Sequence, residues 1–337
     1  MPALRTEVTE IVTGLGTLGA ADLDQALGSR QPAQLRNVDD ATWERLRSAY
    51  REGGHRGEFL AAWNNGRAFL RSTDGLRGRV PAIVEWKGGH RDPGDDVVPS
   101  DLRIDHVYLV SCKYLSRVLH NAAPWALFDR SLAGAAGPRQ DTSWFDAVAP
   151  VEHQRLYQAV RRSHADGLEL PEQVKALTSH QRRELRAAIP RDWSAECADA
   201  YRSLAATASE RSAERWRDQL TSPRERVAML WRLLRLGAAP YFVLGTGAGD
   251  SLRLRVATPW DWRAAYDLRT FDVEPEGTGQ PRVRWWAVVR DREGAREVEV
   301  AGHVEIRWSH GRFGGLPEAK VYLDTPHQRV PGYFPLV

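Results

Sequence analysis

The sequence contains few cysteines and no long apolar run. Its 337 residues include two cysteines, Cys112 and Cys197, which form no CxxC pair and show no metal-ligand spacing. We therefore expect a cytoplasmic protein without disulfides or structural zinc. No stretch approaches the roughly 18 apolar residues of a membrane span. The start, MPALRTEVTEIVTGLG, lacks the apolar centre of an export signal, so we expect neither secretion nor a membrane partner.

Lysine is also scarce. Of the 47 Lys and Arg residues, only Lys87, Lys113, Lys175 and Lys320 are lysines. Arginine is a permanently charged planar fork, whereas lysine is a compact charge whose pKa shifts readily. In a chain that otherwise uses arginine, a lysine marks a position where arginine would not serve. Two of the four, in VEWKGG and VSCKYL, are close together in the sequence.

The overall composition is that of an ordinary folded protein with an unusual supply of tryptophan. The net charge of +3 and pI of 8.9 neither require nor exclude a nucleic-acid partner, because a basic stripe can lie on a nearly neutral protein. Most of the 13 tryptophans are expected to fill cores.

Hydrophobic periodicity divides the chain into four regions and predicts an α+β protein. The expected regions are an N-terminal helical region (1–56), a mixed region (57–135), a helical region (136–236) and a β-rich region (237–337). Helices are expected at DDATWERLRSAYREGG and at GEFLAAWNNGRAFLRS, the second with Phe59, Trp63 and Leu70 on one face. SRVLHNAAPWALFDRSL is read as a helix broken by a proline.

Two short strands, SDLRI and VYLVSCKY, surround a turn at residues 105–106 and predict a β-hairpin. Side chains alternate along a strand, so Ser111 and Lys113 share a face while Cys112 points to the core. With a three-residue loop, Asp101 lies directly across from Ser111, and with a two-residue loop it does not. Asp105, within the turn, is read as a turn residue rather than a ligand.

The predicted order is a helix that carries an acid, then a strand with Asp101, then a strand with Lys113. This order resembles the PD-(D/E)XK, or restriction-endonuclease-like, nuclease fold. The resemblance covers about residues 57–132. It implies a restriction-endonuclease-like α/β core in the mixed region and a Mg²⁺ or Mn²⁺ cofactor. Such an ion acidifies an attacking water, and a lysine steadies the charge that develops on the phosphate.

The sequence departs from the family motif because Ser111 stands where the motif has an acid. Glu85, on the preceding strand, is the expected substitute, and Glu58 on the helix is a second. The implied catalytic residues are Glu85, Asp101, Ser111, Lys113 and Lys87, and the implied metal ligands are Glu85, Asp101 and Glu58. A rival alignment uses Asp74 with Glu85 and Lys87. It is ranked second because a helix is expected directly after SCKYLS.

The C-terminal region interleaves basic and aromatic residues, a composition that suits phosphate contacts and base stacking. Arg307, His310 and Arg312 are the expected nucleic-acid-binding residues, with a bend at 309–311 that turns Arg312 toward a ligand. Two alternatives remain open: a β-sandwich with core tryptophans, or a return of PYFVLG and LRLRV to complete the sheet of the nuclease core.

The sequence thus predicts a Mg²⁺-dependent endonuclease that hydrolyses DNA, of a restriction or anti-phage type. A homodimer is expected, because cutting both strands requires two active sites. The alternative is a nucleic-acid-binding or complex-assembly protein with a degenerate nuclease fold, which Ser111 makes plausible.

Overall fold

The chain forms two units, each built around one β-sheet, and its mixture of helices and strands confirms the α+β class. The computed structural model describes residues 4–28, 30–88, 98–114, 118–129, 143–246, 251–277, 279–309 and 311–337. The first unit comprises residues 1–116, 235–266 and 326–337, and the second comprises 117–234 and 267–325. The expected β-rich region 237–337 therefore contributes to both units.

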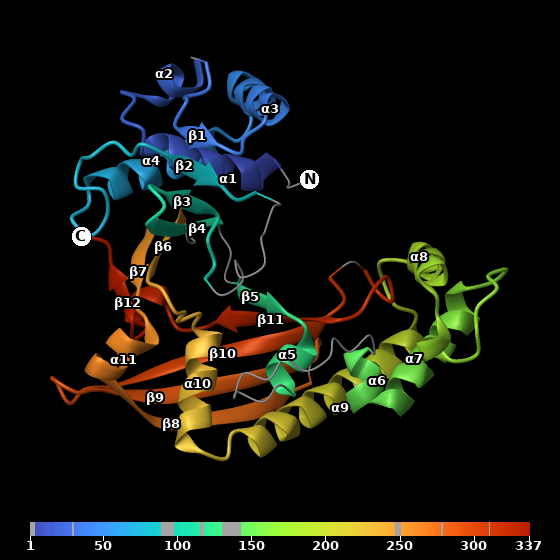
Figure 1. The fold of residues 1–337 in the computed structure, drawn as a ribbon. Helices are drawn as coiled ribbons and strands as arrows, with labels where there is room; N and C mark the ends of the chain where they lie inside the picture. Colours follow the sequence, from blue (N-terminus) through green and yellow to red (C-terminus); the bar gives the residue numbers. More distant parts are fainter. Residues whose placement is uncertain are drawn as a thin grey trace. The chain divides into compact units, whose positions relative to one another are not determined.

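In the described part of the chain, the first unit has a seven-stranded sheet in the order β1-β2-β3-β4-β6-β7-β12 (Figure 1). Its strands are β1 (Leu35–Arg36), β2 (Val84–Trp86), β3 (Leu102–Ile104), β4 (Tyr108–Tyr114), β6 (Tyr241–Thr246), β7 (Ser251–Val256) and β12 (Tyr333–Pro335). β2, β3 and β4 pair antiparallel in succession, and β6 lies parallel to β4. PYFVLG and LRLRV, which form β6 and β7, therefore return to the sheet that contains the hairpin. This confirms the predicted return of these two segments to that sheet.

Helices α1 and α4 cover one face of this sheet. The helical segments of the unit are α1 (Leu4–Gly16), α2 (Leu23–Gly28), α3 (Asp40–Arg51), α4 (Arg56–Arg71), α11 (Pro259–Ala265) and the 3-10 helix η2 (His327–Arg329). Phe59, Trp63 and Leu70 of α4 are buried together, as predicted, in one core with strand residues such as Leu102 and Val110. Burial of each such side chain contributes about 1.5–3 kcal/mol.

Two glycines let α1 and α4 pack backbone against backbone. A Cβ atom on Gly66 would lie 2.1 Å from the carbonyl oxygen of Thr13, and one on Gly16 would lie 2.5 Å from that of Trp63. Real Cβ atoms essentially never come within 3.0 Å of another heavy atom. Only glycine therefore permits this helix crossing.

Local signals determine where several helices begin. The Asp39 carboxylate accepts a hydrogen bond from the backbone N–H of Thr42 at 2.6 Å and caps α3. Three further helices begin with a capping box, which pairs Thr178 with Gln181, Ser222 with Glu225 and Thr258 with Asp261.

Among the described residues, the second unit has a five-stranded antiparallel sheet in the order β5-β11-β10-β9-β8 (Figure 1). Its strands are β5 (Val118–Ala122), β8 (Tyr266–Glu276), β9 (Arg282–Asp291), β10 (Glu297–Arg307) and β11 (Glu318–Leu323). Its helical segments are α5 (Pro124–Phe128), α6 (Trp144–Val148), α7 (Pro150–His164), η1 (Val174–Ala176), α8 (Ser179–Ala188), α9 (Ala195–Gln219) and α10 (Pro223–Leu233). Burial alternates along β9 and β11, as expected for strands with one covered face.

The segment SRVLHNAAPWALFDRSL corrects one prediction. Its first part was expected to be helical, but residues 118–122 form β5, which pairs antiparallel with β11. The short helix α5 begins only at Pro124, where a missing N–H is tolerated in the first turn. The hairpin alignment was ranked first because a helix was expected directly after SCKYLS. For the residues described there, this expectation is wrong.

Most tryptophans lie in cores, as predicted. All 13 are described, and the buried ones are Trp43, Trp63, Trp86, Trp144, Trp216, Trp231, Trp262 and Trp285. Within the described residues, no helix has the length and apolar character needed to cross a membrane.

Candidate functional site

The hairpin of β3 and β4 has a three-residue loop. Leu102 pairs with Val110 and Ile104 with Tyr108, so the next step outward puts Asp101 across from Ser111. The turn residue Asp105 has a left-handed backbone, and its carboxylate accepts hydrogen bonds from two backbone amides of the segment before β2. The register required for a site at Asp101 and Ser111 is therefore present.

The Asp101 carboxylate is held by β4. It accepts a hydrogen bond from the backbone N–H of Cys112 at 2.6 Å and one from the Ser111 hydroxyl at 3.2 Å. Lys113 follows two residues after Ser111 and shares its face of the strand. On the other side, the backbone N–H of Lys87 donates to the carbonyl oxygen of Asp101 at 2.9 Å. The backbone thus puts these residues at neighbouring positions: Lys87 directly after β2, Asp101 directly before β3, and Ser111 and Lys113 within β4.

Glu85 lies one row further along the same face and is paired with Arg103. The guanidinium donates to both carboxylate oxygens, at 2.6 and 2.8 Å, and His106 Nδ1 lies 3.2 Å from Oε2. The hydrogen bond from Arg103 lowers the pKa of Glu85, so the carboxylate is ionised at neutral pH. Both oxygens of the Glu85 carboxylate are thus bonded to Arg103 within the sheet.

Glu58 does not join this group. It lies on α4, which packs on the opposite face of the sheet, and contacts Arg5 at 3.4 Å and His55 at 3.3 Å. Burial alone would raise the pKa of Glu58, but hydrogen bonds from its own backbone and His55 outweigh this effect. The Asp74 of the rival alignment lies after α4, and its backbone N–H donates to Val337, so it is on no strand that pairs with β2.

The acids at the hairpin are a minimal set for a divalent ion. The described residues contain no group of three or more His, Cys, Asp and Glu side chains arranged around a metal position. Mg²⁺ commonly takes only one or two protein carboxylates and completes its shell with water and substrate phosphate. Asp101 supplies one such carboxylate, and the carboxylates of Glu85 and Glu58 each contact an arginine.

Two residues near the hairpin, Glu10 and His327, were not predicted from the sequence. The carboxylate of Glu10 on α1 accepts a hydrogen bond from Trp86 Nε1 at 2.6 Å. Burial, and then the charges of Asp101 and Glu10, raise the pKa of the Cys112 thiol, so both acids lie near this residue. His327 of η2 is close enough to Lys113 that, after burial, the lysine charge lowers its pKa. Neither residue has a local motif, because each reaches the hairpin through long-range packing.

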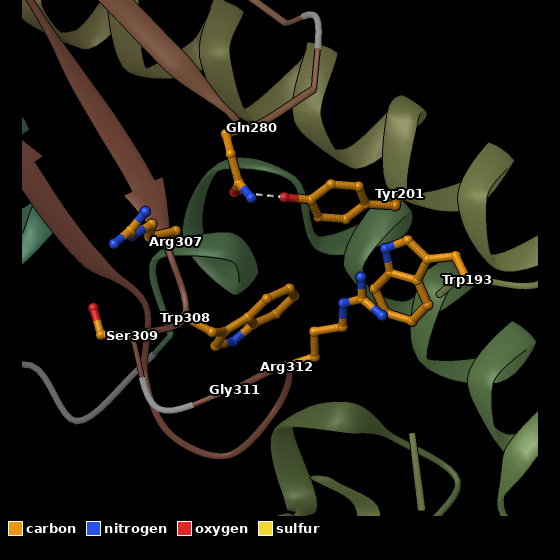
Figure 2. Close-up of a pocket in the computed structure, with 8 residues that line it drawn as sticks. All are labelled: Trp193, Tyr201, Gln280, Arg307, Trp308, Ser309, Gly311 and Arg312. Carbon is orange, nitrogen blue, oxygen red and sulfur yellow. Dashed lines mark hydrogen bonds between the residues drawn. The ribbon is translucent and has the colours of Figure 1, made fainter. Parts of the chain in front are cut away.

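A pocket in the second unit contains both of the described arginines that were predicted to bind nucleic acid. Its volume is about 240 Å³, and it is lined by Trp193, Tyr201, Gln280, Arg307, Trp308, Ser309, Gly311 and Arg312 (Figure 2). β10 ends at Arg307, and the chain then turns at Gly311, whose φ is +90°. Arg307 and Arg312, on the two sides of this turn, line the same pocket. His310 lies outside the described residues.

The polar groups of this pocket are held in fixed positions. The Arg312 guanidinium carbon lies 3.7 Å from the ring centroid of Trp193, and its Nη1 donates to the carbonyl oxygen of Pro190 at 3.1 Å. The Tyr201 hydroxyl donates to Gln280 Oε1 at 2.8 Å (Figure 2). Burial raises the pKa of Tyr201 to about 12, so this phenol stays protonated and keeps its donor role at neutral pH.

Comparison with family models, curated proteins and solved structures finds no match to this chain. The function is therefore inferred from the two sites themselves.

Proposed function

We propose that this protein is a metal-dependent DNA endonuclease with a restriction-endonuclease-like core in its first unit. The observation that carries the proposal is the pairing of Asp101 with Ser111, with Lys113 on the same face. The return of β6 beside β4 gives the hairpin a mixed sheet on which to position these groups, which supports the same assignment.

Each residue of the hairpin site has a distinct role in the proposed hydrolysis. Asp101 would hold a Mg²⁺ or Mn²⁺ ion, which supplies an acidified water and neutralises phosphate charge. The Ser111 hydroxyl and the Cys112 N–H fix the orientation of the Asp101 carboxylate. Lys113 stabilises the charge on the phosphate, and Lys87 adds a second cation to the row. Glu85 keeps Arg103 in place and acts as a positioning residue rather than a ligand.

Plasmid cleavage with Mg²⁺, Mn²⁺ or EDTA tests the proposal. Asp101→Asn preserves the side-chain shape and an acceptor for Cys112 N–H, so it should fold normally but lose cleavage by roughly 100-fold or more. Lys113→Arg should lose most cleavage because the planar fork does not replace a point charge. Lys175→Ala is the matched control, since Lys175 is exposed in the second unit.

Full cleavage by Asp101→Asn at an unchanged melting temperature would remove Asp101 from the site. The same assay on single-stranded and double-stranded RNA decides whether DNA is the substrate. We also propose a homodimer, because hydrolysis of both strands needs two sites; light scattering after size-exclusion chromatography measures the mass directly.

A second candidate function is a nucleic-acid-binding protein whose nuclease core no longer cuts. It is favoured by Ser111 at the position of the motif's acid and by the bonds that occupy both oxygens of Glu85. In this case the wild type cuts no substrate with any metal, yet it binds nucleic acid equally well in EDTA. Fluorescence anisotropy beside the cleavage assay separates the two functions.

A further inference from the structure

The pocket of the second unit has a charge and shape suited to a planar anion. Among its eight lining residues are two arginines and three aromatic side chains, and none is acidic. We propose that this pocket binds one nucleotide unit, with the base stacked on Trp308 and the phosphate held by Arg307 and Arg312. All eight of these residues belong to the second unit, so the proposal stands whether or not the hairpin site cuts DNA.

Arg307 has hydrogen-bonding capacity left for a ligand. Its Nη1 lies 3.4 Å from Glu305 Oε2, longer than an ordinary charged hydrogen bond. Glu305 is buried and receives two shorter bonds, of 2.7 and 3.0 Å, from Arg282. Arg282 therefore offsets most of the Glu305 charge, and the Arg307 fork, 38% exposed, still carries a net attraction for an anion.

Arg312 offers a second guanidinium that is already immobilised. The ring of Trp193 holds one of its faces, and the bond to Pro190 fixes one nitrogen. Among the described residues no carboxylate lies within ion-pair distance of Arg312, and the nearest acidic influence is the charge of Asp192. A guanidinium fork that is fixed before binding loses little conformational entropy when a phosphate docks.

Trp308 supplies a supported surface for a base. Its indole packs against Phe145 at 4.9 Å and Phe313 at 5.0 Å between ring centroids, which fixes the ring. Figure 2 shows this ring between Arg307 and Arg312, with the hydrogen-bonded Tyr201 and Gln280 above it. Stacking on an aromatic ring is the general mode by which proteins hold unpaired bases, and a glutamine amide can hydrogen-bond a base edge.

The size of the pocket sets the limit on the ligand. A volume of about 240 Å³ is below the range typical of larger small-molecule sites, so it admits one base with its sugar and phosphate at the opening. Such a unit has two sources: a free mononucleotide, or an unstacked residue within single-stranded nucleic acid.

Isothermal titration calorimetry on the full chain tests the proposal and distinguishes the sources. The probes are AMP, CMP, adenosine, inorganic phosphate, a short single-stranded oligonucleotide and the same oligonucleotide with abasic residues. We expect a mononucleotide or the intact oligonucleotide to bind, and adenosine, phosphate and the abasic strand to bind more weakly. Binding of AMP and CMP identifies a free nucleotide, and binding of the oligonucleotide alone identifies a strand.

Three substitutions connect binding to the pocket. Trp308→Ala should weaken binding roughly 5- to 150-fold, the range for loss of one stacked base. Because Trp308 also packs on its neighbours, Trp308→Phe is the conservative variant and should retain most affinity. Arg307→Gln should weaken binding of phosphate-bearing probes without affecting the melting temperature. Arg284→Gln, an exposed arginine on β9 outside the pocket, is the control and should bind as the wild type does.

Equal affinity for phosphate and for nucleotides would overturn the role of the base. Absence of binding by every nucleotide and oligonucleotide, or binding that Arg307→Gln and Trp308→Ala leave unchanged, would overturn the site.

Discussion

Gly245→Ala tests the close contact between β6 and the strand that carries Lys113. Gly245 pairs with Lys113, and an added Cβ would lie 2.3 Å from the Lys113 carbonyl oxygen and 2.8 Å from its Cβ. Both are below the 3.0 Å that real Cβ atoms respect, and neither contact is with a flexible side-chain end. The two parallel strands must therefore separate at Lys113.

The expected cost follows from two opposing effects. Overpacking costs about 1–3 kcal/mol, and the loss of glycine entropy in the unfolded chain returns about 0.4–1 kcal/mol. We therefore expect the free energy of unfolding, measured with urea, to fall by about 1–2 kcal/mol. Gly57→Ala is the control, because a Cβ there meets nothing within 4 Å, and it should be neutral or stabilising. A Gly245→Ala protein as stable as the control would refute the contact.

The remaining predictions concern ionisable groups. Glu85→Gln should destabilise the protein by about 1–3 kcal/mol at pH 7, because it weakens the pair with Arg103. The pKa of Glu85 is lowered in the folded protein, so its contribution to stability is full above the unfolded pKa and is lost as the pH falls through the folded pKa. In acid-unfolding curves, the difference in stability between Glu85→Gln and the wild type should therefore shrink below about pH 4. Tyr201→Phe should cost about 0.5–1.5 kcal/mol and remove the absorbance titration near pH 12. Cys112 and Cys197 are buried, and burial raises the pKa of Cys112, so a thiol reagent should label them only in denaturant.

Local patterns were enough to predict several elements of this fold. Acidic caps and helical periodicity identified α3 and α4, and strand alternation put Cys112 in the core and Ser111 on the other face. The hairpin was predicted together with its two possible registers. The helix expected before Pro124 failed because β5 owes its conformation to pairing with β11, about 200 residues away in the sequence.

The sites depended more heavily on contacts that are distant in sequence. The scarcity of lysine singled out Lys87 and Lys113; the backbone N–H of Lys87 bonds to Asp101, and Lys113 lies two residues after Ser111, which also bonds to Asp101. The pairing of Glu85 with Arg103 was not anticipated, because arginine is common throughout this sequence and carries no local signal. In the second unit, Trp193 and Tyr201 come from the helical region, and only the fold brings them to Arg307 and Arg312.

The division of the chain has a consequence for any attempt to take the protein apart. The polypeptide passes from one unit to the other four times, after residues 116, 234, 266 and 325. A single proteolytic cut between β4 and β5 would leave β1–β4 on one fragment and β6, β7 and β12 on the other. The parallel pairing of β4 with β6 would still hold these fragments together, so the nicked protein should elute as one species and separate only in denaturant. The same pairing makes the two pieces natural halves of a split protein, whose reassembly would report on the integrity of the first sheet.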